Sequence, residues 1–386
     1  MEHDILLYVW MDFMEFSQVG LKQKGKVSVI IPTRNRIQEC IDLFAALNDA
    51  VEFVGGCEVI VIDDSTPDNS AQIKRLCNSY GFSFIYTYIH SVAQKRNMGW
   101  TAAKGDIVIF LDSDCLPEKD LIAKHLETYA ESENIGCLGD LSFVGERSIF
   151  FRATEYTPFA KPFQFARRFE STTWGPTANI SFRRSELERV GGFDSSFPER
   201  PGGEDVDIGL RITQNSSPIV CNPSARVGHS TSTWNAFNIN IKRFFGWGRA
   251  DYHLIIRHPQ KVTTDLPRIP LTFTLLLASS VLLSVVKDTF YYLSVPFVWL
   301  IFTMWISAIL FYCESGKPTF IERLIALSYL LANEIGTLYE GLSKKYWPIV
   351  IKRMNYGSGQ IYGEWHEGGR RLWAQWIALI ICYCLY

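Results

Sequence analysis

GDIVIFLDSDC, residues 105–115, decides the fold class of this chain, because a fully apolar run ends in two aspartates one residue apart. Ile107 to Leu111 contains no polar residue, which is typical of a strand buried on both faces of its sheet. Asp112 and Asp114 follow directly, and a buried carboxylate is costly unless it faces water or holds a cation. The stretch therefore predicts a core strand with a Mg²⁺ or Mn²⁺ site at its carboxyl end. A solvated turn is the alternative.

Three more stretches of the same kind precede this one: KVSVIIP (26–32), CEVIVIDD (57–64) and FSFIYTY (82–88). Segments with helical spacing separate them, and this alternation predicts an α/β fold with a mostly parallel sheet flanked by helices. Ligands of such sheets bind beyond the carboxyl ends of the strands, where these stretches carry Thr-Arg-Asn and Asp-Asp. No G-x-G-x-x-G follows the first strand, so the usual dinucleotide fingerprint is missing.

Two local features outside the strands are also predicted. Ser91 is expected to cap a helix that Gly105 ends, since both residue types are common at those positions. Residues 156–177 are aromatic, basic and irregular, and we interpret them as a loop that lines a cleft.

A second group of carboxylates lies much later in the chain. Glu204 and Asp205 begin a predicted helix behind Gly202 and Gly203, where the helix dipole favours negative charge. The glycines would let a substrate approach the backbone closely, whereas a simple capping role is the alternative. His229 ends the next apolar stretch and could ligate Mn²⁺, or it is a plain surface histidine.

Composition excludes some classes of function. The chain has 386 residues and a formal net charge of −2, which gives no support for nucleic acid as a partner. Its nine cysteines form no C-x-x-C pair, so small buried side chains in a reducing compartment are expected.

Long uncharged runs begin at Ile269 and predict membrane-associated helices after a soluble part. Four segments are predicted: spans at 269–286 and 289–313, an interfacial helix at 320–342, and a short span or interfacial helix at 372–386. Glu322, Glu334 and Glu340 make a lipid-facing span at 320–342 expensive. Lysines and arginines on both sides of the hairpin place these flanks, and the soluble part, on the cytoplasmic side of the membrane.

The motifs VSVIIPTRNR, VIVIDDSTPDNS, QKRNMGW…KGDIVIFLDSD, NISFRR…VGGFD and GGEDVDIGLR stand in an order and spacing that resemble the family 2 glycosyltransferases. The resemblance covers about residues 26–230. It implies a GT-A fold and an inverting transfer of a sugar from a nucleotide sugar, assisted by Mg²⁺ or Mn²⁺. The Q-x-x-R-W motif of processive members is absent, which favours a single transfer.

Carried over to this chain, the resemblance implies a role for each candidate residue. Asp205 would be the catalytic base, with Glu204 beside it on the acceptor side. The predicted donor contacts are Pro32, Thr33, Arg34, Asp63, Asp64, Arg96, Asn97, Asp112 and Ser113. The predicted metal ligands are Asp112, Asp114 and His229. The predicted acceptor contacts are Trp174, Asn179, Gly202 and Gly203.

The sequence thus predicts an N-terminal extension (1–25), a GT-A domain (26–256) and a membrane-associated helical region (257–386). Within the GT-A domain, 26–115 would be the nucleotide-sugar-binding half and 116–256 the acceptor half. The expected function is transfer of a sugar, most simply from a UDP-sugar, to a lipid-linked or glycan hydroxyl at the cytoplasmic membrane face. The alternatives are a nucleotidyltransferase of related fold and a non-catalytic, membrane-bound sugar-nucleotide-binding protein.

Overall fold

The computed structural model describes residues 27–130, 134–198, 202–265, 267–310 and 318–357. The predicted extension at 1–25 and the predicted helix at 372–386 lie outside this part. The chain forms two compact units. The first comprises 1–145, 162–199 and 204–230, and the second comprises 146–161, 200–203 and 231–386.

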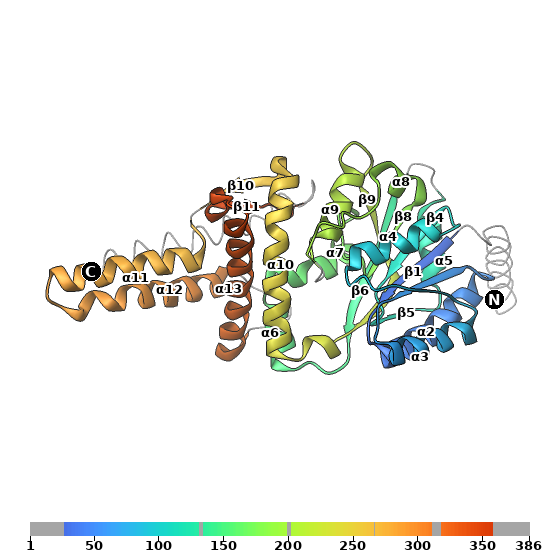
Figure 1. Ribbon diagram of the computed structural model, residues 1–386, viewed down its shortest axis with the longest axis horizontal. Helices are drawn as coiled ribbons and strands as arrows, with labels where there is room; N and C mark the ends of the chain where they lie inside the picture. Colours follow the sequence, from blue (N-terminus) through green and yellow to red (C-terminus); the bar gives the residue numbers. More distant parts are fainter. Residues whose placement is uncertain (1–26, 131–133, 199–201, 266, 311–317, 358–386) are drawn as a thin grey trace, which may run out of the picture. The chain divides into compact units, whose positions relative to one another are not determined.

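The amino-terminal half of the first unit is a parallel sheet (Figure 1). Its strands lie in the order β3 (Ser83–Tyr86), β2 (Glu58–Asp63), β1 (Val27–Thr33) and β4 (Ile107–Leu111). The helices between them are α2 (Ile37–Phe53), α3 (Pro67–Tyr80) and α4 (Val92–Ala102). Every residue of β1 and β4 is buried, as the continuous apolar runs predicted. Thr33 pairs with Asp63, so the polar ends of β1 and β2 meet at one edge of the sheet.

The rest of this sheet is mixed rather than parallel. After β4 follow β8 (Asn179–Arg183), β6 (Gly136–Val144), β9 (Ile219–Ser230) and β5 (Cys115–Pro117), with the short β7 (Ser171–Thr172) on β9. β8 runs antiparallel to β4, and β5 runs antiparallel to β9. The helices of this half are α5 (Leu121–Thr128), α7 (Phe165–Arg168), α8 (Arg184–Val190) and α9 (Glu204–Thr213). The described part of the first unit is therefore an α/β layer structure, as predicted.

Two local predictions need correction. Ser91 does cap α4, because its Oγ accepts a hydrogen bond from the Gln94 N–H, but the helix ends at Ala102 and Gly105 is not its cap. A Cβ at Gly105 would lie 2.6 Å from the backbone N of Ser28, so this glycine is needed for close approach to β1. Residues 156–177 are not one loop, since they contain a 3₁₀ helix (Pro158–Gln164), α7 and β7.

The second unit is helical. Its helices are α6 (Ile149–Glu155), α10 (Phe237–Arg257), α11 (Ile269–Val286), α12 (Val295–Leu310) and α13 (Phe320–Ser343). A small sheet of β10 (Val262–Thr264) and β11 (Lys352–Met354) and 3₁₀ turns at 232–234, 259–261, 290–294 and 347–350 complete it.

Helices α10 and α13 pack with their backbones almost in contact. A Cβ at Gly248 would lie 1.8 Å from the Asn333 carbonyl oxygen, and one at Gly336 would lie 2.1 Å from that of Phe245. Glycines on both helices permit this approach. The structure groups α10 with α13 in the second unit, whereas the sequence predicts a domain limit at residue 256.

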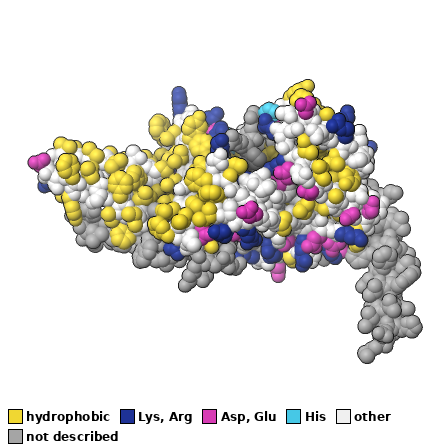
Figure 2. Space-filling model, turned by 90° about the horizontal axis from the view of Figure 1, so that it is seen from below, with side chains coloured by type: hydrophobic (Ala, Val, Ile, Leu, Met, Phe, Trp, Pro, Cys, Tyr) yellow, Lys and Arg dark blue, Asp and Glu magenta, His cyan; other side chains and the backbone are white. Residues whose placement is uncertain are grey.

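Helix α11 has the bounds predicted for the first span. Among the described residues, α11 is the one helix that is both long enough and apolar enough to cross a membrane. Its mean hydropathy is 2.2, and 17% of it is buried. A single helix of this kind is weak evidence for a membrane protein. The predicted second span at 289–313 lies partly outside the described residues, and an apolar helical segment is described with side chains from Phe290 to Thr303. Figure 2 shows hydrophobic side chains gathered on the surface of the part that α11 and α12 form.

Candidate active site

The loops after β1 and β2 hold each other at the carboxyl edge of the sheet. Asn35 adopts a left-handed conformation with φ 54°, and its Oδ1 accepts hydrogen bonds from the Thr66 N–H and the Asn69 side chain. Its own N–H donates to Ser65 Oγ at 2.7 Å. Asparagine tolerates positive φ and bonds locally, which explains its place in this turn. Of the predicted donor contacts, Pro32 and Thr33 therefore end β1, and Arg34 begins the loop that these bonds hold.

The two aspartates at the end of β2 have different surroundings. Asp63 is fully buried and accepts hydrogen bonds from Ser65. Burial raises the pKa of the Cys40 and Cys77 thiols, and the charge of Asp63 adds to this effect. Asp64 instead accepts a hydrogen bond from Lys95 Nζ and lies 2.7 Å from His90 Nδ1. Of these two predicted donor contacts, the structure favours Asp64, because Asp63 faces the core.

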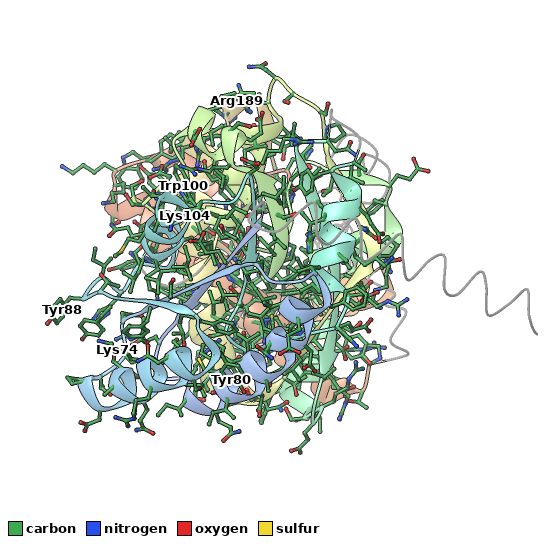
Figure 3. All side chains as sticks on the ribbon, turned by 90° about the vertical axis from the view of Figure 1, so that its right-hand side faces the viewer. Lys74, Tyr80, Tyr88, Trp100, Lys104 and Arg189 are labelled. Atoms are coloured by element: carbon green, nitrogen blue, oxygen red, sulfur yellow. The ribbon has the colours of Figure 1, made fainter. Side chains whose placement is uncertain are left out.

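Arg34 and Lys95 both place a positive charge beside Asp64. Arg34 Nε lies 3.5 Å from Asp64, with half of its side chain exposed. Lys95 also donates to the Thr33 carbonyl at 3.0 Å. Burial lowers the pKa of Lys95, while Asp64 opposes that effect. The exposed Tyr88 projects from the loop after β3 and packs edge-on against Tyr86 (Figure 3).

Arg96 joins the two groups of carboxylates that the sequence separates. One terminal nitrogen lies 2.9 Å from Asp112 Oδ1 and the other lies 2.9 Å from Glu204 Oε1. The side chain is buried, and its guanidinium lies over the Phe193 ring. Arg96 was predicted to hold the nucleotide, but its terminal nitrogens are committed to carboxylates. It is a positioning residue that brings the first turn of α9 to the end of β4.

Asn97 is also structural rather than a donor contact. Its Nδ2 donates to the Phe193 carbonyl, and its Oδ1 accepts from the Phe193 N–H and from Trp100 Nε1. Trp100 lies on the same helix, α4 (Figure 3). Because its side chain is committed to these three bonds, the prediction that Asn97 contacts the donor is corrected.

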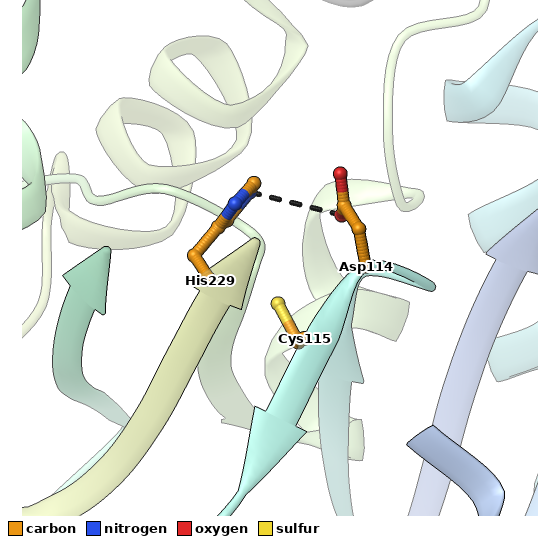
Figure 4. A group of neighbouring side chains, drawn as sticks. All are labelled: Asp114, Cys115 and His229. Atoms are coloured by element: carbon orange, nitrogen blue, oxygen red, sulfur yellow. Dashed lines mark ion pairs between the residues drawn. The ribbon is translucent and has the colours of Figure 1, made fainter. Parts of the chain in front are cut away.

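Asp114 and His229 converge at the ends of β5 and β9 (Figure 4). The register pairs Cys115 with His229, and the Asp114 Oδ1 to His229 Nε2 distance is 3.7 Å. His229 Nδ1 lies 3.1 Å from the Ser230 carbonyl, to which it can only donate. His229 Nε2 therefore faces the Asp114 carboxylate, where both groups could ligate a cation.

The donor set at this point fits a divalent cation. Asp114, Cys115 and His229 offer ligand atoms within 4.8 Å of one another. The Cys115 thiol donates to the Ala178 carbonyl, and burial together with Asp114 raises its pKa well above the usual value. It therefore stays protonated, which leaves the carboxylate and the imidazole as the ligands suited to Mn²⁺ or Mg²⁺.

Arg36 and Ser113 lie beside Asp114. Arg36 Nη1 is 2.9 Å from Asp114 Oδ2 and 3.3 Å from Ser113 Oγ. Sequence analysis missed Arg36, as it missed Lys95 and His90. The signal was present in the arginine repeated two residues apart in TRNR, yet only Arg34 was considered.

Asp205 stands in the first turn of α9 next to buried Glu204. Burial raises the pKa of Asp205 to about 7, and the charge of Glu204 adds to this while Arg96 opposes it. A carboxylate with this pKa is poised to accept a proton near neutral pH. Since Arg96 lies among Asp112, Glu204 and Asp205, the predicted convergence of the two carboxylate groups is present in the structure.

Two of the predicted acceptor contacts, Trp174 and Asn179, are buried in the structure. Asn179 is fully buried, donates to the carbonyls of Asp140 and Ala225, and lies 2.8 Å from His125 Nε2. Trp174 is buried against Phe165. Both are core residues, and we correct their assignment.

Gly202 and Gly203 both have positive φ, at 149° and 86°. A Cβ at Gly202 would lie 2.3 Å from Trp247 Cδ1, so a side chain at this position would meet the indole. The acceptor contacts of Gly202 and Gly203 stay predictions.

Comparison with known proteins gives a family match for part of the chain. Residues 28–191, which include the ends of β1, β2 and β4, match the model of glycosyl transferase family 2. This region is therefore similar to glycosyl transferase family 2. Asp64, Arg96, Asp112 and Asp114 lie within the matched region, whereas Asp205 and His229 follow it.

Curated glycosyltransferases are similar to this chain over part of their length. An uncharacterized glycosyltransferase of Bacillus subtilis is 36% identical over 30% of this chain and 29% of its own. The pre-mycofactocin glycosyltransferase of Mycobacterium tuberculosis is 27% identical over 61% and 48%. A validoxylamine A glucosyltransferase of Streptomyces hygroscopicus is 26% identical over 50% and 52%. The chain thus covers about half or less of each relative.

A solved structure supports the GT-A-like α/β fold. The mannosyltransferase PcManGT of Pyrobaculum calidifontis, in complex with GDP-Man and Mn²⁺, aligns with a TM-score of 0.51. The alignment covers 87% of this chain and 94% of that one at 19% identity, a level that shows the fold alone.

Proposed function

We propose that this protein is an inverting glycosyltransferase that moves a sugar from a nucleoside-diphospho-sugar to an acceptor hydroxyl. The observation that carries the proposal is Arg96, which holds Asp112 and Glu204 on one guanidinium. Asp112, which would face the donor, is thereby joined to Glu204, the neighbour of Asp205, which would activate the acceptor. The family match and the fold of a mannosyltransferase support the same reaction.

Asp112, Asp114 and His229 would hold a divalent cation on the donor side. Such a cation stabilises the negative charge that grows on the leaving diphosphate oxygen, an effect worth several kcal/mol. Asp64 and Lys95 would contact the nucleobase, since their polar atoms meet at the ends of β1 and β2. UDP is our proposed nucleotide, and GDP is its competitor because PcManGT was solved with GDP-Man.

Asp205 would act on the acceptor side. It accepts the proton of the acceptor hydroxyl as that oxygen attacks the anomeric carbon, and the glycosyl–phosphate bond breaks on the opposite face. The sugar configuration is thereby inverted. General base catalysis of this kind contributes about 10²–10⁴-fold to the rate.

Donor hydrolysis tests this proposal without a known acceptor. The purified full chain with Mn²⁺ is expected to release UDP from a UDP-sugar slowly, because water can replace the acceptor hydroxyl. The measurement is nucleotide release from a panel of UDP-, GDP- and dTDP-sugars, with Mg²⁺ as the parallel condition. Release of GDP alone would refute UDP as the donor nucleotide. Pyrophosphate formation from a nucleoside triphosphate and a sugar phosphate would instead indicate the competing nucleotidyltransferase.

We also propose attachment to the cytoplasmic face of a membrane, with a lipid-linked or membrane-proximal glycan acceptor. Helix α13 supports this because its polar side faces the protein. Glu322 lies 2.7 Å from Arg152 Nε, and Glu340 lies 2.7 Å from Arg249 Nε and 3.2 Å from His253 Nε2. The outward side carries exposed Phe320, Ile321, Leu324, Ile335, Tyr339 and Leu342. An apolar outward face next to exposed Lys344 and Lys345 fits an interfacial helix.

Cysteine labelling of the full chain in nanodiscs checks this arrangement. In a background without native cysteines, Ile335→Cys is expected to react at least about tenfold more slowly with a water-soluble maleimide than Arg75→Cys does, because lipid would cover α13. Arg75 lies on the exposed side of α3 in the first unit. Equal rates for the two positions would contradict an interfacial α13.

A further inference from the structure

Two arginines balance the charges of the aspartates that would hold the cation. Arg96 pairs with Asp112, and Arg36 pairs with Asp114, each at 2.9 Å. The structure thus gives each candidate metal-binding carboxylate a guanidinium partner. A divalent cation that enters such a site meets positive charge as well as negative charge.

The two arginines differ in their freedom to move. Arg96 is 2% exposed and joins two carboxylates, so it is fixed. Arg36 is the residue that precedes α2, and about a third of its side chain is exposed. A guanidinium is not deprotonated in proteins, so the ion pair with Asp114 does not depend on pH through Arg36. Arg36 therefore stays charged and has solvent on one side.

Asp114 uses its two oxygens in different directions. Oδ1 lies 3.7 Å from His229 Nε2, whereas Oδ2 lies 2.9 Å from Arg36. A cation held by Asp114 and His229 would thus share the carboxylate with Arg36. The planar guanidinium suits diphosphate oxygens, which it can bind through two parallel hydrogen bonds.

We propose that Arg36 couples the two ligands of this site: its charge weakens the binding of a divalent cation to the empty protein, and it strengthens the binding of a nucleoside diphosphate once the cation is present. This inference rests on the nucleotide-sugar function proposed above. The two effects have one cause, because a positive charge beside Asp114 repels a cation and attracts a diphosphate. Coupling of this kind is reciprocal, so each ligand raises the affinity for the other.

Mn²⁺ titrations of the full chain, followed by electron paramagnetic resonance, measure the first effect. Arg36→Gln is expected to bind Mn²⁺ alone about tenfold more tightly than the wild type does, and Arg36→Lys is expected to lie between them. Arg34→Gln is the matched control, since it removes the same charge from the same loop but contacts Asp64. Its Mn²⁺ affinity is expected to stay within about twofold of the wild type.

Calorimetric titrations with UDP and GDP at saturating Mn²⁺ measure the second effect. Arg36→Gln is expected to bind the preferred nucleotide about tenfold more weakly, opposite in sign to its effect on Mn²⁺. Unchanged or weaker Mn²⁺ binding by Arg36→Gln, or unchanged nucleotide binding, would overturn the inference. These readouts do not depend on turnover. If Arg36→Gln binds Mn²⁺ more tightly and the nucleotide more weakly but the wild type transfers no sugar, only the proposed function is refuted. If the wild type is active and Arg36→Gln changes neither affinity, only the role of Arg36 is refuted.

Discussion

Asp205→Asn is expected to lower turnover at least about a hundredfold while leaving nucleotide binding within about twofold of the wild type. The amide keeps the shape of the side chain but cannot accept a proton from the acceptor hydroxyl, and general base catalysis contributes about 10²–10⁴-fold. Asp205 stands in the first turn of α9, whereas the donor contacts lie at the ends of β1, β2 and β4. Initial rates of nucleotide release with a sugar acceptor, together with UDP calorimetry, measure the two effects.

Asp207→Asn is the matched control, because it changes the same residue type one half-turn further along α9. Asp207 is buried and pairs with Arg211, so the substitution should affect stability more than proton transfer. A rate for Asp205→Asn above a tenth of the wild-type rate would show that another group is the base.

The same carboxylate predicts the acid side of the pH profile. Burial, then Glu204, raise the pKa of Asp205 to about 7, and only the ionised form accepts a proton. The value of kcat/KM should therefore rise about tenfold per pH unit below 7 and level off above it. A flat profile between pH 5.5 and 8 would contradict this assignment.

The parallel half of the sheet could be predicted because its signal is local. Ile107 to Leu111 is apolar throughout, and a strand buried on both faces has no other pattern. The position of Asp112 and Asp114 at its end followed from the same residues. The pairing of β9 with β5, by contrast, depends on strands more than a hundred residues apart, and no local pattern specifies the register that places His229 opposite Cys115.

The errors in the site have one physical origin. A polar side chain that binds a ligand and one that satisfies the protein backbone look alike in the sequence, because both need hydrogen-bond partners. Asn97 bonds to Phe193, 96 residues away, and Asn179 bonds to Ala225. Arg96 pairs with Glu204 at a separation of 108 residues. Such partners become visible only when the chain is folded.

Asp114→Asn is expected to weaken Mn²⁺ binding at least about a hundredfold and to lower turnover about a thousandfold. The side chain keeps its shape, but the site loses the charge that lies 3.7 Å from His229 Nε2 and that would attract the cation. Without the cation, the leaving diphosphate loses a stabilisation of several kcal/mol, and about 4 kcal/mol corresponds to a thousandfold in rate. Mn²⁺ electron paramagnetic resonance and initial rates measure the two losses separately.

Cys115→Ser is the matched control for Asp114→Asn, because it alters the neighbouring member of the same group of potential ligands. Burial raises the pKa of the Cys115 thiol well above its usual value, so the thiol stays protonated and donates to Ala178 instead of binding a hard cation. Mn²⁺ affinity should stay within about twofold. Should Cys115→Ser lose the cation and Asp114→Asn retain it, the thiol would be the ligand and the aspartate only the partner of Arg36. The donor side of the mechanism would then require a softer metal such as Zn²⁺.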